Sequence, residues 1–215
     1  MEKSDNFEKN LPKGYVLVKH VNAASSGKQT LVYSLLAFVP LIIILPLLIL
    51  IAYFTGDITQ FENVGAAVIA GCAVFIVYII LHELTHGVTY KCFTGQKLKF
   101  GLTLTVAFCG VPDIYVRKKA SIAALIMPFA VFSVIFLSLT VGLWFVSPLY
   151  GIVAGAVFAC HLGGCVGDLH WTLMYLTKYK NCNTLMRDTG PEQWLYVPAE
   201  EAEKYGLPVL QTQEQ

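Results

Sequence analysis

The residues of this chain best suited to chemistry are His82, Glu83 and His86, which form a His-Glu-x-x-His motif. Two histidines four positions apart on a helix project from one face, so both imidazoles can bind one zinc ion. The glutamate between them lies beside the metal and can act as general base toward a water molecule. Peptide hydrolysis is the chemistry that this grouping suits, and Zn²⁺ is the expected cofactor.

The motif lies within the apolar stretch 64–90, which as a helix is long enough to cross the ~30 Å hydrocarbon core of a bilayer. Ionisable side chains inside a membrane helix are costly and usually mark a functional site. Only two of the 14 carboxylates lie in apolar stretches of this length, Glu83 and Asp168. A structural alternative for Glu83 is pairing with a histidine that holds two helices together.

The composition places the protein in a membrane. Of the 215 residues, 56% are hydrophobic and 13% charged, and the mean hydropathy is +0.62, which exceeds the apolar share of soluble domains. The fold class expected is an all-α membrane protein, a bundle of about four transmembrane helices. They are expected at 33–54, 64–90, 121–146 and 150–176.

The distribution of positive charge predicts the orientation. All 15 Lys and Arg fall before the first span, between the second and third, or after the fourth. The positive-inside tendency then places these segments, and both termini, on the cytoplasmic side of the cell membrane. We therefore expect a cytoplasmic segment 1–32, a transmembrane core 33–176 and a loosely ordered cytoplasmic tail 177–215. A net charge of +1 gives no electrostatic case for a nucleic-acid partner.

Zinc needs a third protein ligand, and Asp168 is the first candidate. His82 and Asp168 each lie 18 residues into a span that runs toward the cytoplasm, a depth of about 27 Å at ~1.5 Å per residue. His161 lies seven residues before Asp168, on the same helical face. Its imidazole could hydrogen-bond a metal ligand or the substrate carbonyl, be satisfied by the backbone of a neighbouring helix, or replace Asp168 as third ligand.

A β-hairpin is expected between the second and third spans. Residues 98–108 alternate between apolar and polar or small side chains, which predicts a strand. Turn residues follow at 109–113, and 114–117 could return as the second strand. The hairpin could bind an extended substrate by β-addition, or it could simply connect two spans.

The segment from Leu81 to Gly87, together with Gly167-Asp168 in a later span, resembles the putative zincin peptidases, a group of small bacterial multi-span proteins. More distantly it is similar to the site-2 proteases, intramembrane zinc metalloproteases in which a later helix carries an aspartate ligand. In that class a glycine follows the aspartate, whereas here Gly167 precedes Asp168. The resemblance implies a membrane-protein or peptide substrate, with His82, His86 and Asp168 as ligands and Glu83 as catalytic residue.

Two other functions agree with the same residues. Buried histidines and carboxylates also form ion pathways, so the chain could bind or transport a metal without catalysis. Apart from His161 and scattered serine and threonine, however, the spans lack polar residues to line a route. An inactive relative that binds membrane partners is the other possibility, and the intact Glu83 argues against it.

Overall fold

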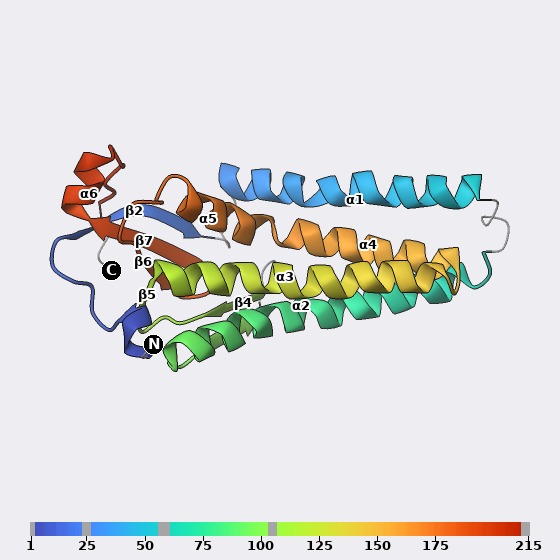
Figure 1. Ribbon diagram of the computed structural model, residues 1–215, viewed down its shortest axis with the longest axis horizontal. Helices are drawn as coiled ribbons and strands as arrows, with labels where there is room; N and C mark the ends of the chain where they lie inside the picture. Colours follow the sequence, from blue (N-terminus) through green and yellow to red (C-terminus); the bar gives the residue numbers. More distant parts are fainter. Residues whose placement is uncertain (1–2, 23–26, 56–60, 103–106, 212–215) are drawn as a thin grey trace. The chain divides into compact units, whose positions relative to one another are not determined.

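The computed structural model of the protein describes residues 3–22, 27–55, 61–102 and 107–211 (Figure 1). The chain divides into two compact units. The first unit comprises Met1–Ser26, Glu83–Met127 and His170–Gln215, and the second comprises Gly27–His82 and Pro128–Leu169.

Long apolar helices make up most of the chain. They are α1 (Lys28–Phe54), α2 (Val64–Thr94), α3 (Lys118–Trp144), α4 (Pro148–Gly164) and α5 (Val166–Leu176). Among the described residues, α1, α2 and α3 are each long and apolar enough to cross a membrane, and α4 with α5 makes a fourth candidate span that is bent by 45°. The protein is therefore a multi-pass membrane protein in its architecture.

The expected span 150–176 consists of two helices, α4 and α5, with a bend between them. Helix α4 ends at Gly163-Gly164, and the Cys165 N–H donates to the carbonyl of His161 where the axis changes direction. Glycine has a low helix propensity, so this is the position where the span breaks most easily. The consequence is that Asp168 lies in the first turn of a separate helix, α5.

In the second unit, α1 packs against α4, and the two ribbons run side by side in Figure 1. The absence of a side chain at Gly163 permits this packing, because a Cβ there would contact the backbone of Ala37 in α1. Large apolar side chains on α1 and α2 remain exposed, including those of Ile42, Ile43, Ile69 and Ile80. Apolar surfaces of this extent suit contact with lipid rather than with water.

The first unit contains a sheet, which corrects the expectation of an all-α protein. Its five strands, in spatial order, are β1 (Phe7–Glu8), β5 (Tyr115–Arg117), β6 (Leu185–Asp188), β7 (Glu192–Pro198) and β2 (Tyr15–Asn22). Every pairing is antiparallel. Short helical elements accompany it, η1 (Lys3–Asn6) and α6 (Ala199–Lys204).

The carboxyl-terminal segment is folded, and the expectation of a loosely ordered tail is wrong for its described part. It supplies β6, β7 and α6 to the sheet. Met186, Leu195 and Val197 are fully buried in one apolar cluster with Trp171 and Tyr175 of α5. The burial of these side chains explains why this segment is folded.

The hairpin between α2 and α3 is present, but its two strands are formed by other residues than expected. Strands β3 (Lys99–Leu102) and β4 (Ala107–Gly110) pair antiparallel. The expected single strand 98–108 is therefore two strands, and the residues between them, 103–106, lie outside the described part. The predicted return strand exists as β5, but it pairs with β1 and β6 rather than with the hairpin.

Asp188 connects the sheet to α2 within the first unit. Its buried carboxylate accepts a hydrogen bond from the Tyr90 hydroxyl (2.8 Å) and one from the Gly190 N–H (2.9 Å). Its backbone carbonyl accepts the N–H of Val111 (2.8 Å), directly after β4. One residue thus joins the end of β6 to α2 and to the hairpin.

Candidate metal centre

The second unit brings His82 and Asp168 together. His82 Nε2 of α2 lies 3.3 Å from Asp168 Oδ2 in the first turn of α5. Two ligand atoms on a tetrahedral zinc ion, each bonded at ~2.0–2.2 Å, are about 3.3–3.6 Å apart. The spacing of this pair therefore fits two zinc ligands.

His86 follows one turn after His82 on the same helix and is buried. Within the first unit, His86 Nδ1 lies 2.9 Å from the carbonyl oxygen of Ala124 in α3. A carbonyl only accepts hydrogen bonds, so Nδ1 carries the proton and donates it. The neutral ring is then unprotonated at Nε2, the form in which imidazole binds a metal.

Glu83 is half-buried on α2, and in the first unit the β3–β4 hairpin packs against the same helix at Gly87. The thiol of Cys109 in β4 has its pKa raised to about 12 by burial, then by the nearby Asp188 and Glu83 carboxylates. Gly87 permits this packing, because a Cβ there would lie 2.6 Å from the Phe100 ring and 3.0 Å from Cys109 Sγ. The hairpin therefore contacts α2 directly after His86.

His161 is fully buried in the second unit, surrounded by the phenyl rings of Phe129, Phe132, Phe136 and Phe158. Its Nδ1 lies 2.9 Å from the hydroxyl oxygen of Tyr78, and that oxygen is also 2.9 Å from His82 Nδ1. The other ring nitrogen, Nε2, lies 3.1 Å from Ser133 Oγ. His161 is thus linked to His82 through one tyrosine.

A second group of potential ligands shares His82. One ligand atom each from His82, His161 and Cys165 all lie within 4.8 Å of one another, and Cys165 Sγ is 3.6 Å from His161 Nδ1. Sequence reasoning assigned no role to Tyr78 or Cys165. A signal for both was present, because each lies four residues, about one helical turn, from a histidine already singled out.

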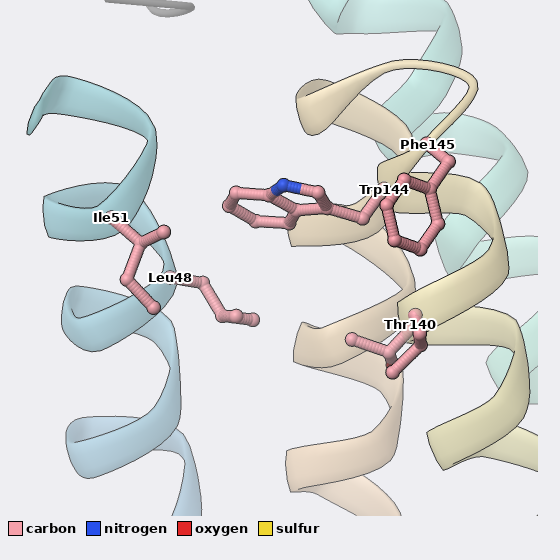
Figure 2. A pocket seen from close by; sticks show the side chains of 6 residues that line it. Leu48, Ile51, Thr140, Trp144 and Phe145 are labelled. Carbon is pink, nitrogen blue, oxygen red and sulfur yellow. The ribbon is translucent and has the colours of Figure 1, made fainter. Parts of the chain in front are cut away.

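A pocket of the second unit lies apart from these residues along the chain. It has a volume of about 240 Å³ and is lined by apolar side chains of α1 and the end of α3, including Leu48, Ile51 and Trp144 (Figure 2). Thr140, the polar residue of the lining, donates its hydroxyl proton to the carbonyl of Phe136 (2.8 Å). The pocket therefore offers no group for metal or acid–base chemistry.

Comparison with known proteins identifies the family. The chain matches no curated protein and no solved structure. Residues 75–184 match the family described as "Putative zincin peptidase". The matched segment makes up just over half of the 215 residues and contains all the potential ligands described above. The chain therefore belongs to the putative zincin peptidase family.

Proposed function

We propose that this protein is an intramembrane zinc metallopeptidase, with His82, His86 and Asp168 as the metal ligands. The observation that carries the proposal is the 3.3 Å separation of His82 Nε2 and Asp168 Oδ2, which fits two corners of a zinc tetrahedron. The hydrogen bond of His86 to Ala124 supports it, because it leaves Nε2 in the metal-binding form. The family match supports the same chemistry.

Glu83 is the proposed general base. When bound, zinc lowers the pKa of a water molecule and polarises the carbonyl of the scissile bond. Glu83 takes the proton from the attacking water and delivers it to the departing amine, so its carboxylate ends the cycle ionised, as it began. Its position on α2 between the two histidines places it on the turn of helix that carries both ligands.

The proposed substrates are membrane proteins or membrane-associated peptides. A transmembrane substrate helix satisfies its backbone groups internally, so the segment to be cleaved must unwind and find other partners. Among the described residues, β3 pairs with β4 alone, and this hairpin contacts α2 at Gly87. Its outer edge can bind an extended substrate by β-addition close to Glu83.

The proposed orientation follows the positive charges. The basic residues before α1, around the hairpin and after α5 all occupy the cytoplasmic side in this arrangement. The metal centre then lies near the cytoplasmic boundary of the membrane, and both termini face the cytoplasm.

A non-catalytic metal-binding or metal-transporting protein is the second candidate. The observation in its favour is the additional group of His161 and Cys165 next to His82, which extends the ligand-type atoms along the second unit. Against a pathway stand the phenyl rings that surround His161. The two candidates differ in their dependence on Glu83, which is essential for hydrolysis and dispensable for metal binding.

The test compares purified wild type with Glu83→Gln and Asp168→Ala. Glu83→Gln should keep its zinc and lose hydrolysis by about 10²–10⁴-fold, because an amide cannot take the proton. Asp168→Ala should lose zinc. Metal analysis measures the zinc content, and proteomics of membrane fragments in cells that carry each variant measures hydrolysis.

The matched control is Glu62→Gln, the same change at an exposed glutamate before α2, which should alter neither property. A wild-type protein that binds no zinc, or a Glu83→Gln variant that cleaves at the wild-type rate, would refute the proposal.

A further inference from the structure

The Tyr78 hydroxyl bridges the two buried histidines of the second unit. Tyr78 is buried on α2, one turn before His82. Its oxygen lies 2.9 Å from His82 Nδ1 and 2.9 Å from His161 Nδ1. It therefore links the two rings, and it touches each at the nitrogen that does not face Asp168 or Ser133.

When His82 binds a metal through Nε2, the hydrogen bonds that join His82, Tyr78, His161 and Ser133 have one consistent arrangement of protons. A neutral imidazole with an unprotonated Nε2 carries its proton on Nδ1, so His82 donates to the tyrosine oxygen. Tyr78 then donates its own proton to His161 Nδ1. The remaining proton of His161 lies on Nε2 and is donated to Ser133 Oγ at 3.1 Å.

The same hydroxyl contacts two members of the second ligand group, His82 and His161. The ligand atoms of His82, His161 and Cys165 lie within 4.8 Å of one another, close enough to surround one ion. The Tyr78 oxygen is at hydrogen-bond distance from Nδ1 of both histidines, and Cys165 Sγ lies 3.6 Å from the same nitrogen of His161. An ion bonded to these atoms at ~2.0–2.3 Å would have to displace the Tyr78 hydroxyl.

We propose that Tyr78 is a positioning residue that selects between two ligand sets around His82: its hydroxyl directs Nε2 toward Asp168 and keeps metal out of the group formed with His161 and Cys165. The inference rests on the proposed zinc site and adds a residue that the motif does not contain. Partners of this kind, which hydrogen-bond the second nitrogen of a ligating histidine, typically contribute 10–100-fold in metal affinity.

The test is Tyr78→Phe, which removes the hydroxyl and keeps the ring. Competition with a zinc chelator should show an affinity about 10–100-fold below wild type. Substitution with Co²⁺ identifies the ligands, because a cobalt–thiolate bond produces a charge-transfer absorption. That absorption should be absent in wild type, present in Tyr78→Phe, and absent again when Cys165→Ser is added.

Phe132→Leu is the matched control, since Phe132 packs edge-on against Tyr78 with ring centroids 5.2 Å apart. This change disturbs the same aromatic cluster but keeps the hydroxyl, so it should lower the thermal stability and leave zinc affinity and the cobalt spectrum unchanged.

A Tyr78→Phe protein with wild-type zinc affinity and no sulfur absorption would overturn the inference. A wild-type protein whose cobalt spectrum already shows the cobalt–thiolate absorption would also overturn it. Failure of the zinc site itself is recognised separately with His82→Ala: if this variant binds zinc as tightly as wild type, the proposed function and the inference both fall.

Discussion

Replacing Gly163 by alanine tests the close packing of α1 against α4. A Cβ at this position would lie 2.9 Å from the carbonyl carbon of Ala37 and 3.2 Å from its Cα, with the carbonyl oxygen nearer still. Carbon atoms pack best at ~3.5–4.0 Å, so α1 must move outward. The obstructing atoms are backbone and cannot rotate away. Overpacking of this kind costs about 1–3 kcal/mol, a large fraction of the stability of a helix pair that depends on van der Waals contact in lipid.

The assay is denaturant unfolding of the purified protein in mild detergent, followed by circular dichroism. Gly163→Ala should lower the free energy of unfolding by about 1–3 kcal/mol. Gly167→Ala is the control, because among the described residues an added Cβ there meets no atom within 4 Å. In α5 this change should be neutral or stabilising by up to about 1 kcal/mol through helix propensity. Equal stability of Gly163→Ala and wild type would refute the packing argument.

Three further predictions concern the first unit. Asp188→Ala removes the acceptor of the Tyr90 and Gly190 hydrogen bonds. It should lower the free energy of unfolding by roughly 1.5–3 kcal/mol for each hydrogen bond to the charged group. Tyr90→Phe removes only one of these hydrogen bonds and is the milder comparison. The pKa of the Cys109 thiol is raised to about 12, so the thiol stays protonated between pH 7 and 9. It should react with iodoacetamide far more slowly in the native than in the denatured protein, as measured by mass spectrometry of the modified peptide. Equal rates would contradict the burial of Cys109. Prolines placed along β3 at Phe100 and Gly101 remove backbone donors and should stop cleavage of an identified substrate while the zinc content stays at the wild-type level; intact cleavage would exclude β-addition.

The membrane helices were predictable because their signal is local. An apolar run of the necessary length can satisfy its backbone groups in lipid only as a helix, and the runs expected at 33–54 and 64–90 agree closely with the candidate spans Leu31–Phe54 and Val64–Thr94. The break at Cys165 was missed because hydropathy continues through it. A glycine pair weakens a helix without making it less apolar.

The sheet was not predictable from local pattern. Its strands come from the amino-terminal segment, the loop before α3 and the carboxyl-terminal segment, and one strand has only two residues. Such short segments carry little periodicity, and their pairing depends on contacts between residues far apart in the sequence. The strand β5 was expected near 114–117, but its partners could not be inferred.

The metal centre shows how far a short motif can be extended by helical periodicity. His82 and His86 lie four residues apart, and the same spacing continues along α2 to Tyr78 before them and to Tyr90 after them. Each side chain on this stripe has a polar partner in its own unit: His161 for Tyr78, Asp168 for His82, the Ala124 carbonyl for His86 and Asp188 for Tyr90. Side chains between these steps, Ile80, Leu84 and Val88, are exposed and apolar. The spacing was visible in the sequence, whereas a tyrosine in an apolar helix also agrees with simple packing. Only the polar partners, which α3, α4, α5 and β6 contribute, distinguish a functional stripe from simple packing, because a buried polar group without a partner is too costly to persist.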